Sequence, residues 1–233
     1  MKRFYKSAAV CNANGGWQVE LDGRAVKTAN GAAQIVVARA LAEAMAAEWN
    51  IQGDEIDPRG LTLRDASDYA IDIVAADRET AIAKLLEYAE TDTLCYRADP
   101  DDALYRRQTE RWDPVLAAFE ESYGLRMERT SGLMHRPQPE AAIANLKRHL
   151  SGLDDFALAA LTTAASLAAS LCIGLAALDD GADAEALWAL ANLEEDWQVE
   201  QWGKDEQAAK LRAERLSNFT AAVRFAALAK ARV

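Results

Sequence analysis

An uncharged run of 23 residues, 156–178, restricts more than any other feature how this chain can fold. About 20 apolar residues can cross a bilayer, so a membrane span has to be weighed against a buried helix. The run contains nine Ala and four Ser or Thr, has acidic pairs at both ends, and lacks a basic flank or an aromatic belt. Its Leu residues recur at a spacing of about 3.6 residues. We therefore expect a buried central helix, without stable membrane insertion; a peripheral membrane protein that uses this run is the alternative.

The first forty residues have a different pattern, in which short apolar runs alternate with turn signals such as Asn14-Gly15, Asp22-Gly23 and Asn30-Gly31. A helix over 38–49 would cover one face of the resulting sheet with Leu41 and Met45. The expected strands are 4–10, 17–21, 24–28 and 34–37. Gly53, Pro58 and Gly60 predict an irregular segment that ends near residue 63.

Helical sequence dominates the rest of the chain, which is rich in Ala and Leu. We expect six or seven helices there. Their ranges are 65–76 and 78–90, which could be continuous, then 102–123, 139–150, 156–178, 183–203 and 205–231. Pro114 would mark a kink or a new start within the third of them. The predicted fold class is α+β: a small N-terminal β-rich α/β domain, residues 1–63, followed by a larger all-α helical domain, residues 64–233.

Composition and motif content exclude several function classes. A formal net charge of −11 argues against nucleic acid, because phosphate binding needs a cationic surface. Three isolated Cys residues and an N-terminus without the apolar region of a secretory signal predict a cytoplasmic protein. Two His residues without a ligand cluster predict no metal site, and the absence of a glycine-rich phosphate loop predicts no nucleotide cofactor.

Residues 187–203, LWALANLEEDWQVEQWG, would form an amphipathic helix that carries acids beside its apolar stripe. At helical spacing Glu194 neighbours Leu190, Ala191, Trp197 and Gln198. Burial of a carboxylate costs several kcal/mol unless the group is paired or hydrogen-bonded. Either a hydrogen bond or an ion pair therefore offsets the cost of burying Glu194, or this face of the helix remains exposed to solvent or to a partner.

The residues alone leave four interpretations of Glu194. It could belong to a solvated helix face, or form an internal salt bridge to Arg107 or Arg111. It could act with a second carboxylate in a helical cleft, as in a hydrolase-like enzyme. Finally, it could anchor a binding surface, to which the amphipathic rings of Trp197 and Trp202 would add apolar area.

Seven sequence blocks then point to a family by their order and spacing. They are FYK (4–6), LDGRAVKT (21–28), AEW with Gln52 (47–52), YAID (69–72), YAETDTLCYRA (88–98), RQTERWDP (107–114) and LEEDWQVEQWG (193–203). Together they resemble the assembly chaperones for the α subunit of the ATP synthase catalytic head. The resemblance covers most of the chain and implies a small N-terminal α/β domain, a larger helical domain and no enzymatic activity. It also implies that the protein is cytoplasmic in alphaproteobacteria and that its eukaryotic relatives are located in the mitochondrial matrix.

The resemblance further implies a client, the unassembled α subunit, which the chaperone holds until the β subunit displaces it. The acidic residue of the family's LE-x-x-[aromatic]-Q block falls on Glu194. The partner-binding residues carried over with it are Trp197, Gln198, Gln201 and Trp202, and we expect a monomer. Two departures stand out: Arg59-Gly60-Leu61-Thr62 replaces Met-Pro-Leu-Thr, and Ala169-Ser170 replaces a Gly-Ser pair.

Overall fold

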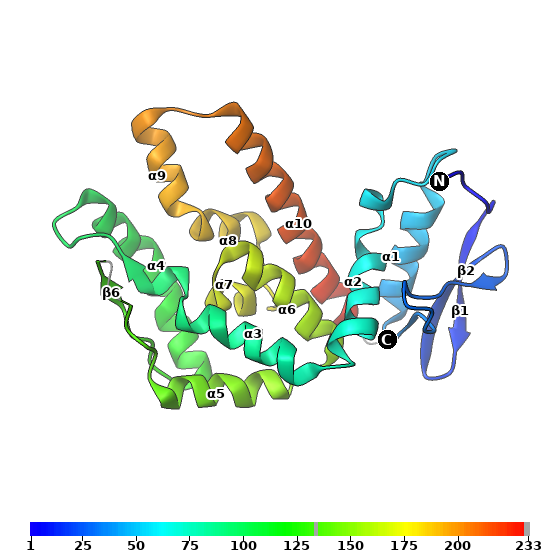
Figure 1. Ribbon diagram of the computed structural model, residues 1–233, viewed down its shortest axis with the longest axis horizontal. Coiled ribbons are helices and arrows are strands. Elements are labelled where there is room, and N and C mark those ends of the chain that lie inside the picture. Colours follow the sequence, from blue (N-terminus) through cyan, green and yellow to red (C-terminus); the bar gives the residue numbers. More distant parts are fainter. Residues whose placement is uncertain (133–134, 231–233) are drawn as a thin grey trace. The chain divides into compact units, whose positions relative to one another are not determined.

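The computed structural model describes residues 1–132 and 135–230, which divide into two compact units. The first unit contains residues 1–78, 154–160 and the described residues from 224 onward. The second contains residues 79–153 and 161–223. The predicted α+β fold class is confirmed: strands gather near the N-terminus, and helices make up most of the remaining described chain (Figure 1). The predicted domain boundary after residue 63 stays a prediction.

A four-stranded sheet forms the N-terminal part of the first unit. Strands β1 (Ala8–Ala13) and β2 (Gly16–Leu21) make an antiparallel hairpin with Val10 opposite Val19. Along the other edge of β2 lie the short strands β3 (Arg24–Ala25) and β4 (Ile35–Val36). At Gly16 the Val36 carbonyl oxygen would lie only 2.5 Å from an added Cβ, so only glycine permits this approach.

The first strand begins four residues later than expected, at Ala8. Residues 4–7 are held in another conformation because the Asp22 carboxylate accepts hydrogen bonds from the backbone amides of Lys6 (2.9 Å) and Ser7 (3.0 Å). These hydrogen bonds also lower the pKa of Asp22. The turn at Asp22-Gly23 was predicted, but this second use of its side chain was not.

Helix α1 (Arg39–Asn50) covers the sheet with the predicted apolar stripe. The stripe residues Leu41, Ala42, Met45 and Trp49 are all buried. Buried Glu48 then accepts hydrogen bonds from the amides of Leu63 and Arg64. This capping explains why the next helix starts before residue 65.

That helix, α2 (Thr62–Tyr69), continues into a π-helical turn, η2 (Ala70–Val74). Helix α3 (Arg78–Glu90) follows after a break at residues 75–77, so the two helices are not continuous. The irregular segment before α2 contains one 3-10 turn, η1 (Pro58–Gly60). A second such turn, η3 (Thr93–Cys95), follows α3.

Helix α4 (Ala103–Tyr123) is the long helix around which the candidate site is built. The Asp102 carboxylate caps its N-terminus, and Gly124 ends it in a left-handed conformation with φ +60°. Pro114 lies inside this helix without breaking it. Helix α5 (Glu140–Ser151) follows, and the short strands β5 (Tyr96–Arg97) and β6 (Thr130–Ser131) pair in parallel.

The uncharged run forms two helices, α6 (Asp155–Ala168) and α7 (Leu171–Ala176), so the expectation of one helix is wrong. The chain breaks at Ala169, whose φ is +48°, and the Ser170 hydroxyl caps α7 by accepting from the Ile173 amide. Buried Asp92 stabilises the break, since its carboxylate accepts hydrogen bonds from the Ser170 hydroxyl (2.7 Å) and the Cys172 amide (2.9 Å). The predicted burial is confirmed, and among the described residues no helix has the length and apolarity that a membrane span needs.

The expected helix over 183–203 is also divided, into α8 (Ala184–Ala191) and α9 (Leu193–Trp202). Asn192 separates them with φ −110° and ψ 22°, and its side-chain amide donates to the Trp188 carbonyl. Helix α10 (Glu206–Lys230) follows α9, while the expected last residue, Ala231, lies outside the described residues. Within the described part of residues 62–230 there are nine α-helices, because two expected helices are split.

Candidate functional site

Helix α9 lies beside α4 and is connected to both α4 and α10 by ion pairs (Figure 1). The Arg107 guanidinium on α4 contacts both carboxylate oxygens of Glu200 at 2.8 Å. On the other side, Arg212 of α10 pairs with Asp196. These two pairs fix the orientation of α9 within the second unit.

Two side chains of α4 contact the helices on either side of the α8–α9 turn. Trp112 bonds to α8, and Gln108 bonds to α9. The buried Trp112 ring donates its indole N–H to the Leu190 carbonyl over 2.9 Å. Gln108 is completely buried one turn earlier on the same helix. The burial of both side chains places them on the inner side of α4.

Gln108 connects the buried interior to Glu194. Its side-chain oxygen accepts a hydrogen bond from the Ala98 amide at 2.8 Å, which fixes the orientation of the side-chain amide. The Nε2 atom therefore faces Glu194 and donates to its Oε1 over 2.6 Å. Glu194 itself is exposed. A neutral, buried donor thus positions a carboxylate that remains open to a partner.

The predicted alternative of a salt bridge from Glu194 to Arg107 is wrong, because Arg107 pairs with a different acid. Arg107 binds Glu200 instead, and its guanidinium lies over the Trp197 ring, 4.7 Å from the centroid. The enzyme alternative also finds no support, because the hydrogen bond recorded for Glu194 comes from a neutral amide and not from a second carboxylic acid.

Four of the five predicted partner-binding residues are exposed on α9: Glu194, Gln198, Gln201 and Trp202. Their spacing of four, seven and eight residues from Glu194 places them along one side of the helix. Trp202 is 79% exposed and the neighbouring Val199 is 42% exposed. The exposed side chains of five residues are called the α9 surface below: Glu194, Gln198, Val199, Gln201 and Trp202.

Trp197 differs from the other predicted residues because it is half-buried beneath Arg107. Its ring therefore stabilises α9 against α4 through a cation–π contact. Sequence spacing did not reveal this contact, nor the pairing of Arg107 with Glu200, because both depend on how two helices from distant parts of the chain meet.

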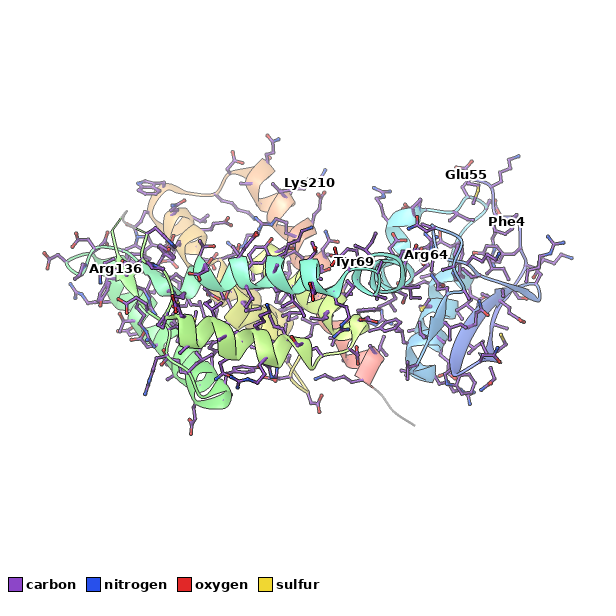
Figure 2. The ribbon with its side chains drawn as sticks, turned by 60° about the horizontal axis from the view of Figure 1, so that its bottom comes forward. Phe4, Glu55, Arg64, Tyr69, Arg136 and Lys210 are labelled. Carbon is purple, nitrogen blue, oxygen red and sulfur yellow. The ribbon has the colours of Figure 1, made fainter. Side chains whose placement is uncertain are left out.

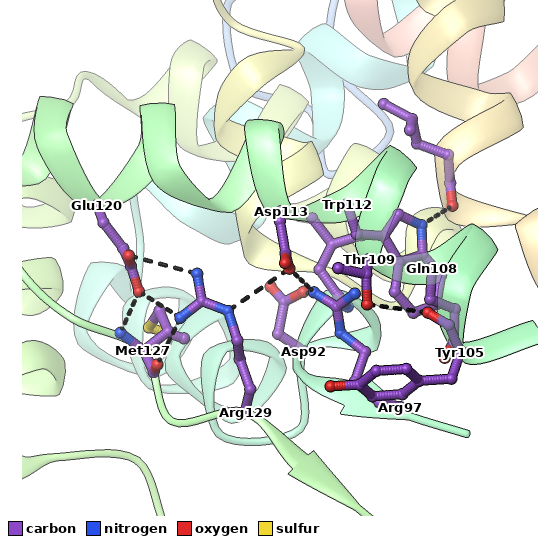
Figure 3. Close-up of polar contacts among 12 residues, drawn as sticks. Asp92, Arg97, Tyr105, Gln108, Thr109, Trp112, Asp113, Glu120, Met127 and Arg129 are labelled. Atoms are coloured by element: carbon purple, nitrogen blue, oxygen red, sulfur yellow. Dashed lines mark hydrogen bonds and ion pairs between the residues drawn. The ribbon is translucent and has the colours of Figure 1, made fainter. Parts of the chain in front are cut away.

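A second polar network supports α4 near its C-terminal half (Figure 3). Buried Glu120 accepts hydrogen bonds from the Met127 amide (2.8 Å) and from Arg129 (3.0 Å), while Asp113 pairs with Arg97 at 2.8 Å. Burial opposes ionisation of Glu120, but these hydrogen bonds outweigh it and lower the pKa of Glu120. The network connects α4 to Arg97 of β5 and to the segment that follows α4, at Met127 and Arg129.

The described residues contain no group of three or more His, Cys, Asp or Glu side chains that could hold a metal ion. Cys95 and Cys172 are buried thiols, and burial raises the pKa of Cys95 to about 12. A buried thiol of high pKa is a poor nucleophile. The exposed side chains of the α9 surface are one carboxylate, two amides and two apolar groups.

Comparison with known proteins gives consistent matches. The sequence model of the ATP12 chaperone protein family matches residues 2–120. The mitochondrial protein atp12 of Schizosaccharomyces pombe is 27% identical, over 93% of this chain and 79% of its own length. The crystal structure of Atp12 from Paracoccus denitrificans superposes with a TM-score of 0.93 and 34% identity, covering 98% of each chain. A structure from Agrobacterium tumefaciens matches with a TM-score of 0.92 and 38% identity, covering 97% of this chain and 85% of that one.

Proposed function

This chain belongs to the ATP12 chaperone family, and on that premise we propose that it binds the unassembled α subunit of the ATP synthase catalytic head. It prevents aggregation of that client and releases it when the β subunit arrives. It acts by binding and not by catalysis, as a monomer, in the bacterial cytoplasm or a compartment derived from it.

The observation that carries this proposal is the positioned, exposed carboxylate of Glu194 on the α9 surface. Because Gln108 already restricts the side chain, little rotamer freedom is lost when a partner binds. A client Arg, Lys or backbone amide could donate to the free oxygen. Such a charge-assisted hydrogen bond contributes about 1.5–3 kcal/mol when the site is desolvated.

The other members of the α9 surface suit a partner that must later leave. Trp202 and Val199 offer apolar area, whereas Gln198 and Gln201 can adapt their amides to donors or acceptors. A few polar anchors around a modest apolar patch give specificity without the very tight binding of a large apolar interface. The β subunit could then displace the chaperone.

The neighbouring acids have different roles. Asp196 and Glu200 are already paired with arginines of this chain, so a client cation would have to compete for them. All three acids of the first turn of α9, including Glu195, also stabilise the helix N-terminus through its dipole. We therefore assign client recognition to Glu194 and structural roles to Asp196 and Glu200.

The proposal is tested by co-expression with a tagged ATP synthase α subunit, followed by pull-down with and without the β subunit. We expect the chain to be retained by the α subunit alone and to be absent once the β subunit is present. A tagged β subunit serves as the matched bait control. Retention on the β subunit alone, or no retention on the α subunit, would contradict the proposal.

A further inference from the structure

The first unit contains an open groove, and all its lining residues lie between positions 1 and 64, far in sequence from the α9 surface. It has a volume of about 570 Å³, a size typical of ligand sites. Its apolar floor contains buried Tyr5, Leu21, Val26 and Trp49. Phe4, labelled in Figure 2, also lines the groove and is 65% exposed. Its ring makes an edge contact with Tyr5.

Two unpaired cations border this groove. Arg24 and Lys27 line it and are exposed, and no ion pair is recorded for either among the described residues. The third cation, Arg64, is already neutralised by Asp65 (2.9 Å) and Asp68 (3.1 Å). A locally cationic border is unusual in a chain whose net charge is −11.

Among the described residues that line the groove there is one acid, Asp22, and no ion pair joins it to these cations. The Asp22 carboxylate accepts hydrogen bonds from the Lys6 and Ser7 amides, which keep it ionised, so its single negative charge offsets only one of the two exposed cations. The groove therefore offers apolar surface and a net positive charge, a combination that favours an acidic, partly apolar ligand.

The position of the groove favours a polypeptide over a small molecule. Strand β3, which carries Arg24 and Ala25, pairs with β2 on one side and ends the sheet on the other. Edge strands have free backbone groups that extended segments can pair with. Both β3 residues are exposed.

From this combination we infer that the groove binds an extended segment of a partner protein, in which a large apolar side chain is flanked by carboxylates. The apolar side chain lies against Phe4 and Tyr5, and the carboxylates contact Arg24 and Lys27. This interaction is separate from the α9 surface and does not depend on the function proposed for it.

Fluorescence anisotropy of labelled synthetic peptides with the full chain tests the inference. The first peptide has a central Leu-Phe pair flanked by Asp and Glu; in the second Ser-Ser replaces Leu-Phe, and in the third Lys replaces the acids. We expect binding of the first peptide and at least about tenfold weaker binding of the other two. Equal affinity for the acidic and basic peptides, or binding of a fluorescent fatty acid and not of the first peptide, would overturn the inference.

Variants locate the binding site. Phe4→Ala and the double variant Arg24→Glu/Lys27→Glu should each weaken binding of the first peptide by about tenfold or more. Ile51→Ala is the apolar control, since Ile51 is 79% exposed but does not line the groove. Lys84→Glu/Lys147→Glu matches the charge change at exposed positions of the second unit. Glu194→Lys should leave peptide binding unchanged, so this inference and the proposed function can fail separately, whereas equal effects of the groove variants and their controls would refute it.

Discussion

Gln108 shows how much one residue can determine at the candidate site. Its side-chain oxygen accepts a hydrogen bond from the Ala98 amide, and its side-chain nitrogen donates one to Glu194. The buried side chain of Gln108 therefore restricts the position of an exposed acid. A leucine of similar size would fill the space but leave the Ala98 amide without an acceptor. The residue is therefore a positioning residue for Glu194.

A double-mutant cycle on Gln108→Leu and Glu194→Ala should reveal this coupling. Because the hydrogen bond joins a neutral donor to a carboxylate at the surface, we expect a coupling free energy of about 1 kcal/mol. Urea denaturation of the four proteins gives the free energies of unfolding. Strictly additive effects of the two substitutions would mean that the hydrogen bond does not form in solution.

His149 provides a test of packing at a different point of the second unit. Its ring packs edge-on against Tyr123, with centroids 4.7 Å apart, and desolvation lowers the pKa of His149 below 6.5. The unfolded chain therefore gains this proton at a higher pH than the folded chain does. Its contribution to stability is fully present above pH 6.5 and is lost as the pH falls through the lowered folded pKa.

An NMR titration of the two imidazoles checks this expectation, with His149→Gln used to assign the signals. We expect the signal of His149 to titrate below pH 6.5. A midpoint above that value would show that the ring is more solvated, or nearer to an acid, than its packing against Tyr123 indicates.

At the scale of elements, the local pattern predicted most helices and strands but missed where two of the helices break. The bounds of α3, and those of α1 to within a residue, followed from apolar periodicity and turn residues. The break at Ala169 could not be found this way, because alanine is a strong helix former and the compensating Asp92 lies far away in sequence. The break at Asn192 depends on tertiary packing in the same way.

The same limit applies to the candidate site. Spacing placed Glu194, Gln198 and Trp202 on roughly one face with Gln201 alongside it, and all four residues are exposed. It could not show which arginine pairs with which acid, because the partners of Glu200 and Asp196 lie on α4 and α10. Pairing between helices is a property of the packed molecule and not of the local sequence.

Ala169→Gly should stabilise the protein by about 1 kcal/mol. Ala169 has a φ of +48°, in the left-handed region where a Cβ atom is strained and glycine is not. The resemblance to the chaperone family had led us to expect glycine here, in a Gly-Ser pair. Thermal and urea denaturation measure the effect.

Ala118→Gly is the control, at an exposed position inside α4, where glycine should instead cost about 1 kcal/mol. If both substitutions destabilised the protein equally, the left-handed conformation at residue 169 would be wrong.

At the scale of the whole molecule, the chain combines a strongly acidic surface with a few specific binding groups. A net charge of −11 attracts a client surface that carries Arg or Lys and speeds the encounter at low ionic strength. The long-range field does not choose the client, however. Under the proposed function, selection falls to the positioned carboxylate of Glu194 and to the apolar side chains beside it.

Protection of the ATP synthase α subunit from heat-induced aggregation, followed by light scattering, tests that conclusion most directly when Glu194→Lys is compared with Glu195→Lys. Both substitutions invert a charge in the first turn of α9, but only Glu194 is positioned by Gln108. Circular dichroism should show that both variants fold. We expect Glu195→Lys to protect the client like the unmodified chain and Glu194→Lys to lose protection; equal protection by the two folded variants would contradict the assigned role of Glu194.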